Sequence, residues 1–407
     1  MEKEKNKERI PQLRFPEFKN APAWEQRKLG EVAEITMGQS PNSANYTNNP
    51  SDHILVQGNA DMRNGYVHPR VWTTQVTKTA KKGALIISVR APVGDVGKTE
   101  YKVVLGRGVA AIQGNEFIFQ LLSKMKINGY WEKLSTGSTF ESINSNDLKD
   151  ASISLPSLPE QTAIGDFFSN LDRSIALHQR ELENLKNRKK SLLQKMFPKN
   201  GESVPKIRFP EFKNAPAWEQ RKLGEVSTHR CGTSIEKYFD SKGVYKVISI
   251  GSYGLDGEYI DQGIRASSNN ITDKKTVKNN ELTMVLNDKT TNGTIIGRTL
   301  LIRSDNEYVV NQRTEIISPN NNFDPQFAFT LLNGSFREQV KKIVQGGTQI
   351  YVNYSSVERL KFYIPSLSEQ KAIGDFFSTL DRSIALHQRK LEHLKLRKKA
   401  LLQKMFP

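Results

Sequence analysis

Apolar residues recur at alternating spacings of four and three along two stretches of the chain, 156–198 and 365–407. This period places one narrow apolar stripe along a helix and, sustained over several heptads, predicts a coiled coil. Glu160 and Glu369, each three residues after a serine, fit capping boxes at the two helix starts. The seam residues are Ile164, Phe168, Leu171, Ile175, Leu182, Leu185 and Leu192 in the first stretch and Ile373, Phe377, Leu380, Ile384, Leu391, Leu394 and Leu401 in the second.

The two helical stretches are copies of each other. They match at 36 of 43 aligned positions, and none of the seven differences falls on the seam, as pairing of the two helices with each other would demand. Charge then selects the orientation, because a parallel pair would stack Lys189 on Lys398 whereas an antiparallel pair sets Lys189 near Asp381. We expect the antiparallel pair; two independent helices that pack on their own domains are the alternative.

Two blocks of short apolar runs, 33–154 and 227–363, precede the helical stretches. Gly, Asn, Ser and Pro interrupt the runs, which predicts mostly antiparallel sheet with long polar loops. Although the blocks share little sequence, each has a strand carrying an arginine, Arg107 or Arg313, and then a glycine-rich loop, so they resemble divergent versions of one domain. The strand candidates are 84–97, 101–112, 245–254 and 308–317, and the helix candidates are Phe117–Lys126 and Pro325–Phe336.

A string of 19 residues, RFPEFKNAPAWEQRKLGEV, occurs without change at 14–32 and at 208–226. It leads into each block, and its aromatic residues are candidate anchors. One interpretation is that these aromatics pack the block onto the helices. The other is that identical segments meet identical partners while the divergent blocks meet different ones. The anchors are Phe15, Phe18 and Trp24 in the first copy and Phe209, Phe212 and Trp218 in the second.

Composition adds a partner class. The chain of 407 residues has a net charge of +17, and such a balance favours a polyanion, because Lys and Arg that neutralise phosphates dominate nucleic-acid affinity. No apolar run is long enough to cross a membrane, and the N-terminus lacks a signal-peptide core. A single cysteine, Cys231, excludes a disulfide framework, and zinc-ligand spacings are missing. We therefore expect a cytoplasmic protein that binds no metal.

Enzyme motifs are missing as well. The sequence contains no GxxxxGK[ST] phosphate loop. The nearest approach to the Asn/Asp-Pro-Pro-aromatic string of adenine methyltransferases, at 49–52, fails at two positions. Glu17 and Lys19 have the spacing of a nuclease pair, but the exact second copy of the string indicates a structural repeat. We predict that the chain is not itself an enzyme.

Several strings together resemble a known family. SVRAPVGDVG, LGRGVAAI, STGSTFESINSNDLKDASISLPSLPEQ, VNQRTEII and the two helices ending in LLQKMF are similar to specificity subunits of type I restriction-modification systems (the HsdS family), over essentially the whole chain. The resemblance implies two target-recognition domains, separated by two repeat helices that pair antiparallel. It implies double-stranded DNA, two copies of a methyltransferase subunit and restriction/translocase subunits as partners. S-adenosylmethionine, ATP and Mg²⁺ would be bound by those partners and not by this chain.

The expected fold is α+β, with two mostly-β domains, a long antiparallel two-helix coiled coil and an internal pseudo-two-fold repeat. A helix of about 35 residues spans roughly 53 Å, so the first helix would carry the chain to the far end and the second would return it. Two readers held in this way would address two different half-sites about one DNA turn (~34–36 Å) apart. The predicted segments are 1–154, 155–198, 199–363 and 364–407.

Loop residues that form bidentate bonds to bases, or that neutralise phosphates, are the candidate DNA-binding residues. Arg107 and Arg313 could equally tie strands together. The alternative to DNA recognition is a non-catalytic scaffold whose two blocks bind proteins or other ligands. The candidates are Arg63, Asn64, Tyr66, Arg90, Arg107, Ser138 and Thr139 in the first block and Tyr253, Lys289, Thr291, Asn292, Gln312, Arg313, Gln349 and Tyr351 in the second.

Overall fold

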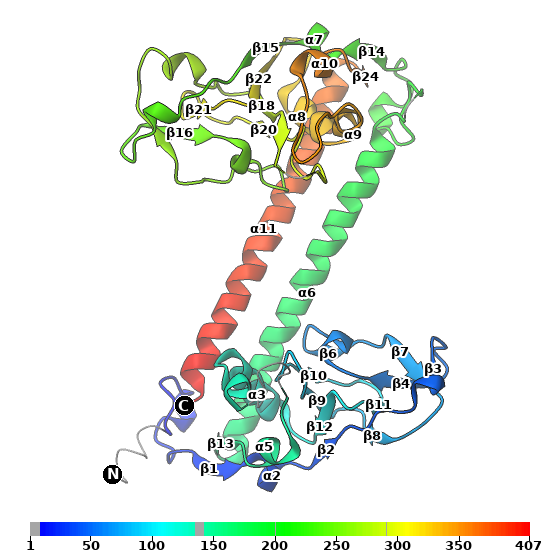
Figure 1. Cartoon of the computed structure of the whole chain (residues 1–407), viewed down its shortest axis with the longest axis vertical. Coiled ribbons are helices and arrows are strands. Elements are labelled where there is room, and N and C mark those ends of the chain that lie inside the picture. Colours follow the sequence, from blue (N-terminus) through cyan, green and yellow to red (C-terminus); the bar gives the residue numbers. More distant parts are fainter. Residues whose placement is uncertain (1–8, 135–141, 200, 290) are drawn as a thin grey trace. The chain divides into compact units, whose positions relative to one another are not determined.

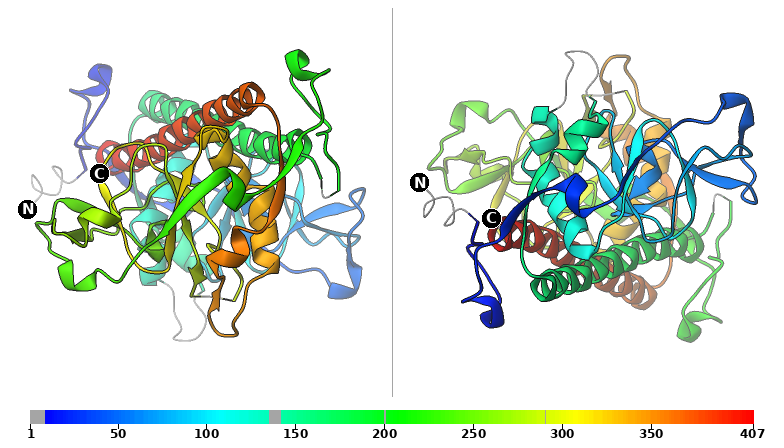
Figure 2. Two further views of the ribbon diagram at one scale, coloured as in Figure 1. Left: turned by 90° about the horizontal axis from the view of Figure 1, so that it is seen from above. Right: turned by 90° about the horizontal axis from the view of Figure 1, so that it is seen from below.

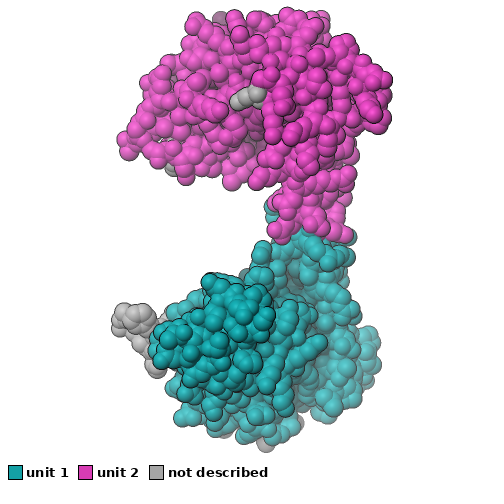
Figure 3. Space-filling model, turned by 90° about the vertical axis from the view of Figure 1, so that its right-hand side faces the viewer, with its two compact units in different colours: residues 1–180, 388–407 teal, residues 181–387 magenta. Residues whose placement is uncertain are grey.

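The computed structural model describes residues 9–134, 142–199, 201–289 and 291–407. They form two compact units, Met1–Arg180 with Gln388–Pro407 (unit 1) and Glu181–His387 (unit 2). Figure 1 labels their helices and strands, and Figure 3 colours the two units separately. The units divide the chain differently from the segments expected above, because each long helix contributes one half to each unit.

The two long helices, α6 (Leu158–Met196) and α11 (Leu367–Met405), are each 39 residues long. They run antiparallel within both units. In unit 1 the Lys398 ammonium lies 2.6 Å from the Asp172 carboxylate, and in unit 2 Lys189 lies 2.5 Å from Asp381. The orientation predicted from charge is therefore confirmed, and in both units a cation near one helix end meets an acid of the partner helix.

Each long helix buries the face that carries its seam residues and leaves the opposite face exposed, as expected for a pair of helices. The 14 seam residues are all buried or half-buried, with Phe168 and Phe377 fully enclosed. Leucines off the seam stay in solvent, such as Leu386 and Leu396, which are 65% and 68% exposed. Gly165 and Gly374 lie where the first turn of a short helix packs closely against the long helix. A Cβ on Gly374 would lie 2.8 Å from the Phe327 backbone nitrogen, so the close approach requires glycine.

Unit 1 contains an antiparallel ribbon of β1 and β13, a six-stranded sheet ordered β2-β12-β9-β10-β6-β5, and a five-stranded sheet ordered β3-β7-β4-β11-β8. Strands β9 and β12 are buried throughout. The strands are β1 (Glu25–Lys28), β2 (Ile35–Met37), β3 (Tyr46–Thr47), β4 (His53–Val56), β5 (Met62–Arg63), β6 (Tyr66–Val67), β7 (Val71–Thr73), β8 (Lys78–Ala80), β9 (Leu85–Ser88), β10 (Val96–Lys98), β11 (Val103–Leu105), β12 (Val109–Ile112) and β13 (Ser152–Leu155).

Unit 2 contains the ribbon β14-β24, a four-stranded sheet ordered β15-β22-β18-β20, a three-stranded sheet ordered β17-β16-β21 and the pair β19-β23. Its strands are β14 (Glu219–Lys222), β15 (Ser227–Cys231), β16 (Tyr245–Ile248), β17 (Arg265–Ala266), β18 (Leu282–Val285), β19 (Asn287–Asp288), β20 (Thr299–Leu301), β21 (Tyr308–Val310), β22 (Thr314–Pro319), β23 (Ile350–Tyr351) and β24 (Lys361–Ile364).

Short helices complete each unit. The Asn115 side chain caps α3 by accepting from the Ile118 amide, and Asp324 caps α8 in the same way with a proline at the first helical position. The predicted helix through Phe336 is divided at Gly334 into α8 and α9. The short helices are α2 (Leu29–Val32), α3 (Glu116–Ile127), α4 (Tyr130–Leu134) and α5 (Ser145–Lys149) in unit 1, and α7 (Leu223–Val226), α8 (Pro325–Asn333), α9 (Ser335–Lys342) and α10 (Tyr354–Val357) in unit 2.

The two units share one topology. The order β2-β12-β9-β10 in unit 1 corresponds to β15-β22-β18-β20 in unit 2, and the ribbon β1-β13 corresponds to β14-β24. The parallel pair β4-β11 corresponds to the parallel pair β16-β21. The strands of both units pair mostly antiparallel, as the short runs predicted. The parallel pairs, among them β4-β11 and β16-β21, are the exceptions, and a short run does not reveal them because it does not specify the direction of its neighbour.

Each core includes the end of a long helix. Phe406, at the end of α11, packs with its ring centroid 5.8 Å from that of Trp24 and 5.1 Å from that of Phe117. In unit 2, Phe197 lies 5.9 Å from Trp218 and 5.6 Å from Phe327. The last residues of the chain therefore complete the core of the first domain.

Candidate nucleic-acid interface

The hairpin of β5 and β6 presents three of the candidate residues of unit 1. Asn64 and Gly65 form its turn with φ of 54° and 78°, the left-handed pair that type I′ hairpins require. Arg63 and Tyr66 face each other in the register on either side of this turn. Both are exposed, as is Asn64. The hairpin therefore displays a guanidinium, an amide and a phenol on a tight turn.

A second group of unit 1 candidates lies around Val89. The Val89 amide donates to the Gly108 carbonyl, and the Val89 carbonyl accepts from the Ile143 amide, so the chain after β9, the β11–β12 turn and residues 142–143 lie side by side. Arg90 and Arg107 are exposed on these segments. We call this region the loop end of unit 1.

Arg107 lies in a turn and not on a strand as predicted, because Gly106 and Gly108 flank it between β11 and β12. Its amide donates to the Ser40 hydroxyl at 3.0 Å. Within the described ranges no carboxylate pairs with the guanidinium of Arg90 or Arg107, so both can reach a phosphate or a base edge. The candidates Ser138 and Thr139 lie outside the described residues.

Unit 2 has a corresponding loop end, centred on Leu286. The Leu286 amide donates to the Arg313 carbonyl at 3.0 Å, and the Leu286 carbonyl accepts from Val352 at 2.9 Å. Arg313 lies in the β21–β22 turn with a φ of 66°, so it too lies in a turn and not on a strand. The equivalent turn in unit 1 carries Arg107.

Gln312 precedes Arg313 in the same turn, and its side chain is hydrogen-bonded to Glu236. Its amide nitrogen donates to the Glu236 carboxylate at 3.0 Å, and Asn311 donates to the same oxygen at 3.0 Å. The hydroxyl of Ser234 donates to the other oxygen at 2.5 Å. These bonds, that of Ser234 first, lower the pKa of Glu236 to about 2. Glu236 is therefore a fixed anion that orients the Gln312 side chain.

The remaining candidates of unit 2 gather beside this turn. β19 pairs with β23, and Asn287 opposes Tyr351, so the residues that follow β19 lie near those that precede β23. Arg337, which the sequence reasoning missed, supports this region from below: its buried guanidinium donates to the carbonyls of Gly293, Thr294 and Ile296 at 2.8–2.9 Å. The exposed candidates here are Lys289, Thr291, Asn292, Gln349 and Tyr351.

Tyr253 is a wrong candidate. Its side chain is 3% exposed, and its hydroxyl bonds to Thr283 at 3.0 Å within a hydrophobic cluster. Burial raises the pKa of this hydroxyl far above its ordinary value. The sequence suggested a polar loop because Tyr253 lies in a Gly- and Ser-rich stretch, but the aromatic ring instead fixes that stretch to the sheet.

The identical string is tied to the start of each long helix by an arginine. Arg14 donates to both carboxylate oxygens of Glu160 at 2.6 Å and to the Ala21 carbonyl at 2.7 Å. The side chains of Arg14 and Glu160 are 7% and 1% exposed. Glu160 therefore serves a buried ion pair, where the sequence had suggested a capping box.

Unit 2 repeats this anchor with Arg208 and Glu369, at 2.6–2.7 Å. The aromatic anchors follow the same plan, since Phe15 packs edge-on against Phe167 and Phe209 against Phe376, each at 5.7 Å. In Figure 2 the segments just before β1 and β14, coloured blue and green, project from their units as two hooks. Trp24 and Trp218 are buried, whereas Phe18 and Phe212 are half-buried.

Each unit thus combines a mixed domain with a copy of the repeated helix, and the loop ends of the two domains differ in sequence. Residues 22–187 and 216–396 match the sequence model of the type I restriction modification DNA specificity domain, and the chain belongs to this family. Within the described residues, no helix is long and apolar enough to span a membrane.

The relatives include three proteins of Methanocaldococcus jannaschii. The chain is 22% identical over 417 residues to the type I restriction enzyme MjaIX specificity subunit, covering 94% of this chain and 92% of that one. It is 26% identical to the MjaVIII specificity subunit, with 69% and 68% covered. It is 35% identical to the putative MjaX specificity subunit over 178 residues, which are 42% of this chain and 41% of that protein.

Solved structures show the same fold. The S subunit of a type I restriction-modification system from M. genitalium superposes with a TM-score of 0.66 at 16% identity, covering 98% of this chain and 99% of that one. A chain from a study of complex assembly in a type I restriction-modification system gives a TM-score of 0.52 at 17% identity, with 94% and 97% covered. At these identities the likeness concerns the fold.

Proposed function

We propose that this chain is the sequence-reading subunit of a type I restriction-modification complex and recognises an asymmetric bipartite DNA site, one half-site per unit. The chain performs no chemistry. It acts in the cytoplasm and directs partner subunits that methylate adenine with S-adenosylmethionine, or that translocate and cut DNA with ATP and Mg²⁺.

One observation carries the proposal. The same β–turn–β element displays Arg107 in unit 1 and Arg313 in unit 2, on matching frames whose surrounding loops differ in sequence. An arginine at the same turn position in both units, beside polar side chains that differ between them, suits a reader, because arginine binds phosphate or guanine while its neighbours set the base preference. Two domains with the same sheet order but different loops should recognise two different DNA sequences.

The duplicated hooks support a second part of the proposal, two copies of one methyltransferase subunit. The two hooks are identical in sequence and are held in the same way, by Arg14–Glu160 or Arg208–Glu369. The first turns of the long helices differ at one position, Pro159 in α6 and Ser368 in α11. Leu158 and Leu367 are 66% and 36% exposed beside these anchors. A partner that docks on the identical hook of one unit finds the same hook on the other.

Methylome sequencing of cells that hold the methyltransferase subunit, with and without this chain, tests the proposal. With the chain, we expect methylated adenine in one motif made of two specified halves and an unspecified spacer. Replacing block 33–154 by that of another family member should change one half of the motif and leave the other intact.

Two results would contradict this function. A single contiguous motif would exclude two separate readers. Absence of DNA binding at every salt concentration, with partner subunits supplied, would favour a scaffold whose blocks bind other ligands.

A further inference from the structure

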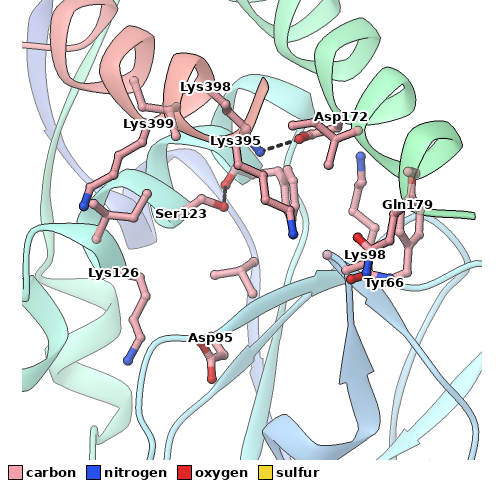
Figure 4. Close-up of a pocket in the computed structure, with 18 of the residues that line it drawn as sticks. Tyr66, Asp95, Lys98, Ser123, Lys126, Asp172, Gln179, Lys395, Lys398 and Lys399 are labelled. Carbon is pink, nitrogen blue, oxygen red and sulfur yellow. Dashed lines mark hydrogen bonds and ion pairs between the residues drawn. The ribbon is translucent and has the colours of Figure 1, made fainter. Parts of the chain in front are cut away.

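Unit 1 has a pocket of about 390 Å³ between its β5–β6 hairpin, the middle of α6 and the last turns of α11. Asn64 and Tyr66 of the hairpin form one wall, Phe119 of α3 lies behind them, and α6 and α11 form the opposite wall. Figure 4 shows three lysines, Lys395, Lys398 and Lys399, entering from α11. Both the hairpin and the far end of the chain therefore line one groove.

Three lysines of this pocket are already neutralised. Lys98 pairs with Glu116 at 2.8 Å and also lies over the rings of Tyr66 and Phe119, at 5.1 and 4.6 Å from their centroids. Lys398 pairs with Asp172 at 2.6 Å. Lys126 pairs with a glutamate of α4, Glu132, at 2.7 Å. These pairs fix the walls and leave little charge to attract a ligand.

Lys395 and Lys399 differ from these three, because neither has a hydrogen-bond or ion-pair partner among the described residues. They are one helical turn apart, so they are neighbours on the same face of α11. Both are exposed. The lining has two carboxylates. That of Asp172 is paired with Lys398, and that of Asp95 lies across the pocket from α11 (Figure 4), where it would keep an anion on the lysine side.

The corresponding place in unit 2 is built differently. The pair Lys189–Asp381 and the ring of Phe329 repeat Lys398–Asp172 and Phe119, but the pocket there measures only about 100 Å³. Arg298 fills it and donates to the carbonyls of Leu255 and Thr294 at 2.9 and 3.0 Å. Lys186 and Lys190, the repeat counterparts of Lys395 and Lys399, are not in the described lining of this pocket.

We infer that the groove of unit 1 holds the sugar–phosphate backbone of DNA beside the half-site that unit 1 reads, with Lys395 and Lys399 as phosphate contacts. The inference rests on the proposed function. A duplex bound by Asn64 and Tyr66 would lie against the hairpin wall. The opposite wall would then face the DNA backbone with Lys395 and Lys399, which have no ion-pair partner among the described residues. Such contacts position the protein on the duplex and carry no sequence information. The C-terminal helix thus contributes to DNA binding by the first domain.

The test is the affinity for duplex DNA containing the methylated motif, measured with the full chain in complex with its methyltransferase subunit, across a range of salt concentrations. Each phosphate contact contributes about 0.9 to the slope of log affinity against log salt. The double variant Lys395→Gln/Lys399→Gln should therefore weaken binding at low salt and reduce the slope by about 2. Discrimination against a duplex with an altered half-site should stay as in the wild type.

The matched control is Lys186→Gln/Lys190→Gln, the same change at the repeat positions of α6. For this control we expect the salt slope to change by less than half as much as in the Lys395/Lys399 variant. If both double variants behave alike, or if the Lys395/Lys399 variant keeps the wild-type slope, the inference is overturned. It is also overturned if that variant loses the methyltransferase subunit in mass photometry, because the lysines would then bind protein. A wild-type complex that binds no DNA contradicts the proposed function itself.

Discussion

Unit 1 and unit 2 have matching frames and different surfaces. The frame of each consists of the hook, the buried arginine–glutamate pair, the aromatic cluster around Trp24 or Trp218, and the end of a long helix. The surfaces differ at the loop ends, where Arg107 corresponds to Arg313 but the loops around them differ in sequence. They also differ in the pocket beside the helices, which is about 390 Å³ in unit 1 and about 100 Å³ in unit 2.

This contrast indicates which parts of the chain perform the same task twice. Duplication alone would leave the blocks as similar as the hooks and helices. Identity is instead confined to the residues that hold each domain on the helices and to the faces around them. The divergent residues are those that the proposed function assigns to two different half-sites.

The largest expected effect concerns the helix ends. Phe406→Ala should destabilise unit 1, and Phe197→Ala unit 2, each by about 4 kcal/mol, because each leaves a cavity in an aromatic cluster. Amide hydrogen exchange, followed separately for the residues of each unit, measures the loss of stability in both variants. Leu396→Ala, on the same helix as Phe406 but 68% exposed, is the control and should change stability by less than about 0.5 kcal/mol. Loosening of unit 2 by Phe406→Ala would show that the cores are not separate.

A somewhat smaller effect is expected at the anchors. Arg14→Ala and Arg208→Ala each leave a buried carboxylate without its partner, which costs about 3 kcal/mol. Arg208→Ala should cost more, because the Trp24 indole also donates to Glu160 at 3.4 Å and the indole nitrogen of Trp218 has no such bond among the described residues. Thermal unfolding measures the difference, with Arg221→Ala, at an exposed arginine, as control. Equal losses would show that Trp24 does not support Glu160.

At the loop ends we expect effects on DNA and not on folding. Arg107→Ala and Arg313→Ala should each weaken binding by about 1–3 kcal/mol. Each should alter one half of the motif only, because the two turns belong to different units. Competition binding against duplexes altered in one half-site distinguishes the two. A variant that weakens binding equally for all sequences would identify its arginine as a phosphate contact.

The smallest effect concerns pH. The pKa of Glu236 is lowered to about 2 from 4.5, so its bonds to Ser234, Asn311 and Gln312 stabilise the fold above pH 4.5, and this contribution is lost as the pH falls from 4.5 towards 2. NMR titration of the Glu236 carboxyl carbon should show the low midpoint. Glu236→Gln should remove this part of the acid dependence and increase hydrogen exchange in the Arg313 turn. An ordinary midpoint near 4.5 would mean that Gln312 is not held in solution.

The sequence by itself determined the plan of this protein. The two helical copies, their seam and their antiparallel pairing followed from period and charge, because a coiled coil repeats one local contact along its length. The strands around Arg107 and Arg313 and the correspondence of the two blocks were also readable, since short apolar runs and glycine turns are local signals. Family resemblance then indicated the class of function.

Only the tertiary structure decided which residues meet. Glu160 had the spacing of a helix cap, but Arg14, 146 residues away, takes its carboxylate. Tyr253 had the surroundings of an exposed loop residue, and Thr283 binds it inside the core. Phe406 ends a helix in the sequence and fills the core of the first domain in the structure. Each of these contacts joins distant segments, and their partners are chosen by packing, which local sequence pattern does not encode.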